Sequence, residues 1–234
     1  MGLKNVEGSD SSRPFSDDMY DGGDRAGWGD ANETCGVCEH CISGEWIYCS
    51  DGLKHYGDGN TDQGSFATGV VWREQALFHI PDSMASDVAA DRMCAGITVF
   101  SPLTRYGLKS SDRVGVVGIG RLGRLALQFV RTLGCEVVAL SSTKEKNEEA
   151  LRLEAIRFVA RKGKKQLSVP RKINHLIVTT SHVPGKQFDA ILAPVASIYP
   201  LTITDFEAML EIPYVSFLLS GRKFIGSAVP PKAV

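Results

Sequence analysis

The sequence has no excess of charge of either sign, since 26 Lys and Arg stand against 27 Asp and Glu. This balance argues against binding that depends mainly on neutralising phosphates, as on nucleic acid or an anionic membrane. The basic run at residues 161–165 has no interleaved aromatic residues, so we interpret it as a solvated loop. No hydrophobic run approaches the ~20 residues of a membrane span, and residues 1–20 do not resemble a signal peptide. We therefore expect a cytoplasmic protein with no nucleic-acid or membrane partner.

Cysteine is also scarce, with six residues in 234, which argues against a disulfide framework as the basis of the fold. Four of the six follow each other at short spacing: Cys35, Cys38, Cys41 and Cys49. Four thiolates separated by small residues can surround a structural zinc ion with no open position. An iron-sulfur cluster and unligated thiols are the alternatives, although clusters usually place the fourth ligand at another spacing and often before Pro. We predict a structural zinc.

The composition and the hydrophobic periodicity of the sequence change along the chain. Residues 1–21 lack hydrophobic periodicity and are expected to be a disordered leader. Residues 22–105 are rich in glycine and short β-like runs around the cysteines, and end in a helical segment. Residues 106–234 alternate apolar strands with amphipathic helices, which is typical of an α/β domain with a doubly wound parallel sheet. The six predicted strands are 113–118, 136–141, 156–159, 175–179, 196–201 and 223–229.

An apolar strand runs into a Gly-x-Gly-x-x-Gly turn at residues 118–123, and an amphipathic helix follows. In this context Gly118 allows the tight turn, Gly120 lets a pyrophosphate approach the backbone, and Gly123 lets the helix pack on the sheet. A glycine-rich packing turn is the alternative, and Arg121 could equally be a solvated side chain. The predicted dinucleotide-binding residues of the turn are Gly118, Ile119, Gly120, Arg121, Leu122 and Gly123.

The end of the second strand bears on the choice of cofactor. An NAD site usually has an acidic residue about 20 positions after the glycines, but here the sequence is Ser141-Ser142-Thr143, followed by Lys146. Hydroxyl donors and a cation suit the 2'-phosphate of NADP, which a carboxylate would repel. We infer a preference for NADP(H). These residues could also, or instead, form a capping box from Ser142 to Glu145 for the next helix.

The cysteine lobe, a Cys94-Ala-Gly-Ile-Thr98 segment and the glycine turn follow one another in this order. The combination resembles the zinc-dependent medium-chain alcohol dehydrogenases, in particular their NADP-using, cinnamyl alcohol dehydrogenase-like branch. The resemblance covers about residues 22–229 and implies a partial GroES-like catalytic domain followed by a Rossmann domain. It implies that Cys94 is a catalytic-zinc ligand, that Thr98 lies beside the nicotinamide, and that the four-cysteine lobe holds structural zinc.

The implied activity is that of an oxidoreductase, with hydride transfer between NADP(H) and an alcohol/aldehyde pair, of the aromatic, cinnamyl type among others. The family's upstream Gly-x-Cys-His segment and His-Glu pair are absent from this sequence, and His40, His55 and His79 are weak substitutes. The chain is therefore expected to be truncated at both ends. An inactive remnant that binds NADP and zinc is the alternative, and a homodimer is the assembly that we consider.

Overall fold

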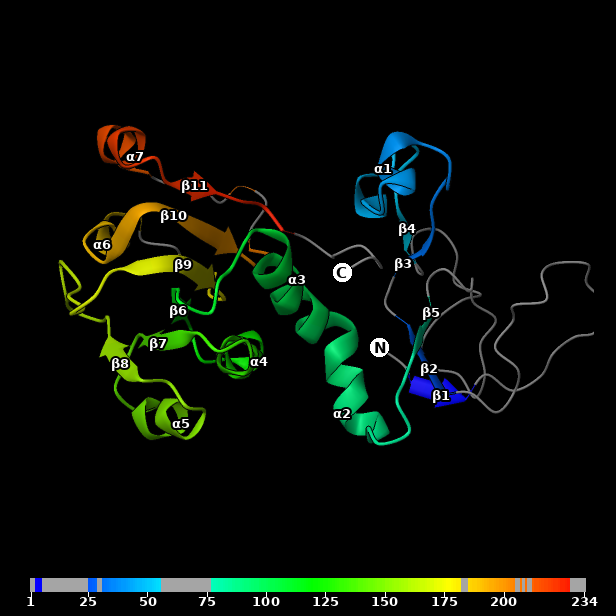
Figure 1. Ribbon diagram of the computed structural model, residues 1–234, viewed down its shortest axis with the longest axis horizontal. Coiled ribbons are helices and arrows are strands. Elements are labelled where there is room, and N and C mark those ends of the chain that lie inside the picture. The colour runs from blue at the N-terminus through cyan, green and yellow to red at the C-terminus, as the bar shows by residue number, and fades with distance from the viewer. Residues whose placement is uncertain are drawn as a thin grey trace, which may run out of the picture. The chain divides into compact units, whose positions relative to one another are not determined.

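A computed structural model describes residues 3–5, 25–28, 31–55, 77–181, 185–204, 207, 209 and 212–227 (Figure 1). The chain divides into two units, Met1–Ile97 with Val229–Val234, and Thr98–Ala228. The predicted domains 22–105 and 106–234 stay predictions. Within the described residues, no helix is long and apolar enough to cross a membrane.

The second unit contains a six-stranded parallel sheet in the order β11-β10-β9-β6-β7-β8. When β6 to β11 are numbered 1 to 6 and the sheet is read from β8 to β11, the strand order is 3-2-1-4-5-6, which is the order of dinucleotide-binding sheets. The order reverses between β6 and β9, so a crevice is expected beyond the carboxyl ends of these two strands. The strands are β6 (Arg113–Val117), β7 (Glu136–Ser141), β8 (Arg157–Ala160), β9 (Ile173–Val178), β10 (Leu192–Pro200) and β11 (Lys223–Phe224).

The central strands of this sheet carry apolar residues on both faces, and apolar layers cover and bury both faces. One layer packs residues of α3 (Ile97–Arg105), α4 (Arg121–Thr132) and α5 (Asn147–Arg152) against β6, β7 and β9. The other contains Phe188 of α6 (Gly185–Asp189), and the ring of Phe217 in α7 (Tyr214–Ser220) lies 5.8 Å from that of Phe224 in β11. This arrangement confirms the predicted doubly wound α/β class.

Polar side chains at the amino ends of β6, β7 and β9 contact one another and β10. The ring of His175 lies between Tyr199, whose hydroxyl is 2.9 Å from Nδ1, and Asp112, whose Oδ2 is 3.2 Å from Nε2. Burial lowers the pKa of His175 although the Asp112 carboxylate opposes that shift. Nearby, Arg113 donates to the carboxylate of Glu136 at 2.7 and 2.9 Å. These contacts join the amino ends of β6, β7 and β9, and Tyr199 contacts His175 from near the carboxyl end of β10.

The described residues of the first unit form two small antiparallel sheets. The strands β1 (Leu3–Asn5), β2 (Arg25–Trp28) and β5 (Leu77–His79) pair in the order β1-β2-β5. Of the predicted leader 1–21, the structure describes only β1, a strand that we did not expect. The strands β3 (Ala31–Glu33) and β4 (Lys54–His55) flank the cysteine lobe, which contains α1 (Glu39–Ile42) and the 3-10 turn η1 (Trp46–Tyr48).

The predicted elements agree with the observed ones except at their ends. The helical segment predicted to lead from Ser86 to Cys94 is α2 (Ser86–Asp91) followed by a π-helical stretch, η3 (Arg92–Gly96). The strand β10 begins at Leu192, before the predicted 196, and contains an irregularity at which Val195 has a φ of 59°. The β-like run 69–72 lies outside the described residues.

Candidate functional site

The glycine turn joins β6 to α4 at the carboxyl edge of the sheet. Gly118 has a φ of 93°, a conformation that L side chains rarely adopt, and a Cβ there would lie 2.5 Å from Cγ2 of Thr180. Its N–H donates to the carbonyl of Leu140 in β7 at 2.8 Å. Ile119 is 3% exposed and belongs to the core beneath α4. The turn is thus fixed by strain-free glycine geometry and by both neighbouring strands.

The other two glycines of the motif meet opposite surroundings. A Cβ on Gly123 would lie 1.9 Å from the carbonyl oxygen of Gly118, so this position requires glycine for close packing of α4. A Cβ on Gly120 would have no atom within 4 Å, and Gly120 is exposed at the N-cap of α4. The space beside Gly120 is therefore open at the N-terminus of a twelve-residue helix, where backbone N–H groups and the helix dipole favour an anion. These surroundings fit a pyrophosphate.

The predicted hydroxyl residues follow directly from β7. Ser141 is the buried last residue of the strand, Ser142 is exposed and Thr143 is half-buried. The helix α5 begins at Asn147, and its N-cap is Lys146, without a side-chain cap. The capping box from Ser142 to Glu145 is therefore wrong, because Ser142 lies too far before the helix to cap it. The hydroxyls are left for other partners.

Lys146 reaches back from α5 to the glycine turn. Its Nζ donates to the carbonyl of Ile119 at 2.6 Å in a half-buried contact. An ammonium has three donors, so this bond leaves two for other acceptors. The sequence placed Lys146 near the adenosine end of the cofactor, but it contains no signal for the bond to Ile119. The structure thus brings Lys146 together with the turn residues 118–123 on one side and the hydroxyls 141–143 on the other.

The basic run that follows β8 also lies beside these hydroxyls. The backbone N–H of Arg161 donates to the carbonyl of Ser141 at 2.8 Å, and that of Lys162 donates to Ser142 at 2.9 Å. The side chain of Lys162 is exposed. Parallel pairing of β7 and β8 therefore carries positive charge to the carboxyl end of β7. The sequence alone does not reveal this proximity, since it depends on strand register.

The four cysteines of the lobe converge on one point. Their sulfur atoms all lie within 4.8 Å of one another, and the Sγ atoms of Cys35 and Cys41 are 3.9 Å apart. Tetrahedral zinc with bonds of about 2.3 Å places its sulfur ligands about 3.8 Å apart. The backbone N–H of Cys35 donates to Sγ of Cys49 at 3.3 Å, as second-layer donors do in thiolate sites. The four residues therefore fit a closed, structural zinc site.

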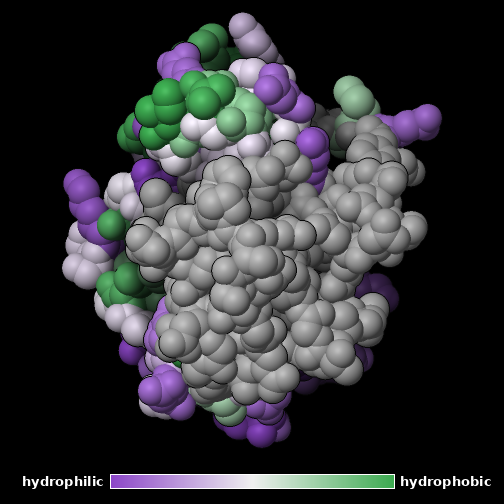
Figure 2. Space-filling view, turned by 90° about the vertical axis from the view of Figure 1, so that its right-hand side faces the viewer, coloured by the Kyte–Doolittle hydropathy of each residue, from purple (hydrophilic) through white to green (hydrophobic). Residues whose placement is uncertain are grey.

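The ionisation of these thiols is interdependent. Backbone hydrogen bonds, first of all one with Ser50, lower the pKa of Cys38 to about 5. The backbone hydrogen bond with Val37 favours the thiolate of Cys35, but burial and neighbouring thiols outweigh it and raise the pKa of Cys35 to about 11. Four thiolates in one small volume repel each other unless a cation lies between them. The side chains of Val37 (78% exposed) and Ile42 (75% exposed) in the lobe are open to solvent. Figure 2 shows exposed hydrophobic residues, in green, at the top of the face that it views.

The two remaining predicted residues lie on the helical segment before the sheet. Cys94 is exposed and belongs to the π-helical stretch η3, and Thr98 is half-buried in α3. Among the described residues, the lobe cysteines form the only group of three or more side chains placed to hold a metal ion. The described residues therefore do not by themselves provide a catalytic zinc site at Cys94. The roles of Cys94 and Thr98 stay predictions.

An apolar hollow lies elsewhere, beside β9, β10 and β11. Its lining includes Phe188, Phe217 and Phe224, together with the ion pair between Arg222 and Asp189. It contains none of the residues predicted to bind a cofactor or metal. The glycine turn therefore remains the candidate site for the cofactor.

Comparisons with known proteins identify relatives of this chain, although no family model matches it. The chain is 32% identical to a probable cinnamyl alcohol dehydrogenase 3 of Oryza sativa subsp. japonica over 218 residues, which is 90% of this chain and 59% of that protein. It is 39% identical to a probable formaldehyde dehydrogenase of Bacillus subtilis over 143 residues, covering 59% of this chain and 41% of that protein. The chain spans about half the length of the curated relatives it matches, for example 38% of a probable cinnamyl alcohol dehydrogenase of Eucalyptus globulus.

Solved structures give the same result. A cinnamyl alcohol dehydrogenase from Sorghum bicolor matches with a TM-score of 0.75 and 28% identity, over 90% of this chain and 62% of that one. One from Helicobacter pylori, complexed with NADP(H), matches in fold with a TM-score of 0.78 at 21% identity, over 94% of this chain and 63% of that one. By sequence and by fold, the chain is a homologue of the cinnamyl alcohol dehydrogenases, among the zinc-dependent alcohol dehydrogenases.

Proposed function

We propose that the chain binds NADP(H) at the glycine turn and serves hydride transfer between this cofactor and an alcohol/aldehyde pair, of the aromatic, cinnamyl type among others. The observation that carries the proposal is the contrast within the turn, where Gly123 is closed by backbone and Gly120 faces open space at the N-terminus of α4. The relatives named as cinnamyl alcohol dehydrogenases support the reaction class.

The residues of the turn would act by binding and orientation. The backbone N–H groups of the first turn of α4, which a helix does not bond internally, favour the negative charge of a pyrophosphate, and Gly120 lets it approach the backbone. The buried strands β6, β7 and β9 hold this end of the sheet rigid, so the cofactor would meet a preformed surface. When bound, NADP(H) supplies the hydride that is exchanged with the substrate carbon.

The preference for NADP over NAD is supported by the groups that follow β7. Ser141, Ser142 and Thr143 offer hydroxyl donors, Lys146 offers a cation, and the backbone bond to Ser142 brings Lys162 close. A 2'-phosphate carries negative charge that these groups can bind, and no carboxylate stands in the position that usually recognises a ribose hydroxyl.

The test is a charge reversal at the exposed Ser142. Ser142→Asp should weaken NADPH binding roughly tenfold, or about 1.4 kcal/mol, because a carboxylate repels the 2'-phosphate, while NADH binding stays equal or improves. Titration calorimetry with both cofactors measures the two affinities. Ser110→Asp, an exposed serine before β6, makes the same charge change at the opposite end of the sheet and is the matched control. Equal weakening of NADPH by both variants would contradict the proposed site.

We also propose that Cys35, Cys38, Cys41 and Cys49 hold one structural zinc ion, supported by the convergence of their sulfur atoms. Turnover needs a test of its own, because the described residues do not complete a metal site at Cys94. Oxidation of NADPH with an aromatic aldehyde, together with two zinc ions per chain, would support catalysis. One zinc ion and no oxidation would restrict the chain to cofactor and structural-metal binding.

Two further expectations, a cytoplasmic location and a homodimer, belong to this proposal. None of the six cysteines, all of them among the described residues, forms a disulfide, which suits the reducing cytoplasm. The exposed apolar side chains of α7, among them Leu218 and Leu219, suit a contact between two copies of the chain in a homodimer. Light scattering of the purified protein measures the second expectation, and a monomer at micromolar concentration would exclude it.

A further inference from the structure

The ammonium of Lys146 has a protein partner inside the glycine turn. Nζ lies 2.6 Å from the carbonyl oxygen of Ile119, a residue that is only 3% exposed. This carbonyl precedes the N-cap Gly120, whose own carbonyl accepts the first helical bond of α4 from Arg124 at 3.0 Å. The Ile119 carbonyl therefore lies outside the helix ladder, and a buried carbonyl needs a donor from elsewhere. Lys146 is that donor.

The preceding carbonyl is held from the other side. Oγ1 of Thr179, the residue after β9, donates to the carbonyl of Gly118 at 3.1 Å and to that of Val117 at 2.9 Å. Two successive carbonyls of the turn, those of Gly118 and Ile119, are thus bound by side chains that follow the strands on either side of β6. Because a peptide unit is planar and trans, fixing a carbonyl also fixes the opposite direction of the next N–H. The two side chains together set the path of the chain into α4.

The position of Lys146 is itself supported by neighbouring charges. Arg124 of α4 forms an ion pair with Glu149 of α5. The hydrogen bond from Arg124 is the main cause of the lowered pKa of Glu149, and the charge of Lys146 contributes. The ammonium therefore has a carboxylate near it as well as the carbonyl. It does not depend on a phosphate for its place.

We propose that Lys146 is a positioning residue that holds the glycine turn in its binding shape before any cofactor arrives. Its bond to Ile119 serves dinucleotides with and without a 2'-phosphate alike. A lysine that acted only as a phosphate ligand would affect NADPH alone. The binding part of this inference rests on the proposed function.

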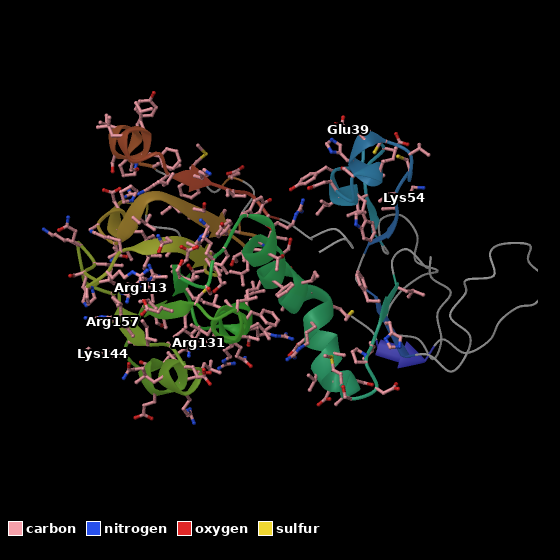
Figure 3. All side chains as sticks on the ribbon, viewed as in Figure 1. Glu39, Lys54, Arg113, Arg131, Lys144 and Arg157 are labelled. Atoms are coloured by element: carbon pink, nitrogen blue, oxygen red, sulfur yellow. The ribbon has the colours of Figure 1, made fainter. Side chains whose placement is uncertain are left out.

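The first measurement is binding of NADH, which has no 2'-phosphate. Lys146→Met should weaken both NADH and NADPH roughly tenfold or more, since a charge-assisted hydrogen bond that orders the site is lost. Lys146→Gln, which keeps an N–H donor without the charge, should weaken NADH less than Lys146→Met. Lys144→Met is the matched control, because Lys144 is an exposed lysine just before α5 (Figure 3), and it should leave NADH binding unchanged.

The second measurement needs no cofactor. Hydrogen exchange followed by mass spectrometry on the peptide around residues 117–124 should be several-fold faster in Lys146→Met than in Lys144→Met or the unchanged protein. Unaltered exchange, or a loss of NADPH binding with NADH binding retained, would overturn the positioning role. If the unchanged protein binds neither dinucleotide, the proposed function fails, and the exchange rates alone decide whether Lys146 holds the turn.

Discussion

Gly123 offers the sharpest test of how the turn is built. Its substitution by Ala adds one methyl group at a point 1.9 Å from the Gly118 carbonyl oxygen and 3.2 Å from Oγ1 of Thr179. The carbonyl belongs to the backbone and is already bound by Thr179, so it cannot rotate away. The helix α4 must withdraw from the sheet instead, and its fully buried residues Ala126 and Leu127 lose contacts.

The size of the effect follows from two opposing contributions. Overpacking that moves backbone costs about 3 kcal/mol, at the upper end of the usual range. Alanine has a higher helix propensity than glycine by about 1 kcal/mol, which offsets part of this cost. We expect Gly123→Ala to lower the free energy of unfolding by about 2 kcal/mol, which corresponds to a fall of roughly 4–8 °C in Tm.

Gly120→Ala is the matched comparison within the same turn. Its φ of -93° suits alanine, and no atom lies within 4 Å of the added methyl group. The stability loss should stay below about 1 kcal/mol, the usual effect of alanine at an N-cap. The methyl group would, however, occupy the space predicted for the pyrophosphate, so the affinity for NADPH should fall at least tenfold.

Thermal unfolding followed by circular dichroism and calorimetric titration with NADPH measure the two effects. The expected pattern is a loss of stability in Gly123→Ala and a loss of binding at full stability in Gly120→Ala. An unchanged Tm in Gly123→Ala would refute the packing argument. Unchanged NADPH affinity in Gly120→Ala would refute the placement of the cofactor.

Two further predictions concern the rest of the chain. Because burial lowers the pKa of His175 below its ordinary value of 6.5, the unfolded chain binds more protons than the folded chain just below that pH. Stability should therefore fall as the pH drops through 6.5. In a plot of the urea unfolding midpoint against pH, His175→Gln should reduce the slope below pH 6.5, and an unaltered slope would contradict the role of His175. Cys49→Ala removes one of the four predicted zinc ligands of the lobe. The zinc content measured by elemental analysis should therefore fall from one ion per chain to almost none, whereas Cys135→Ala should keep the zinc.

Local patterns in the sequence were enough to predict the sheet and the lobe. Strands buried on both faces appear as continuous apolar runs, and four cysteines within fifteen positions can meet whatever the surrounding fold. The contacts of Lys146 and His175 could not be predicted in this way. The partners of Lys146 and His175 are 24 to 63 residues distant along the chain, and only strand order and register bring them together. The capping box failed because α5 begins later than its sequence pattern suggested.

The contacts among Asp112, His175 and Tyr199 have a consequence for how this sheet can change. They join the amino ends of β6 and β9 and add Tyr199 from the last residues of β10, while the glycine turn and the hydroxyls of Ser141 and Ser142 lie at the carboxyl ends of β6 and β7. Substitutions at the first edge should therefore alter stability, and substitutions at the second should alter which cofactor is bound. Cofactor preference can then be redesigned at one edge while the other keeps the sheet folded.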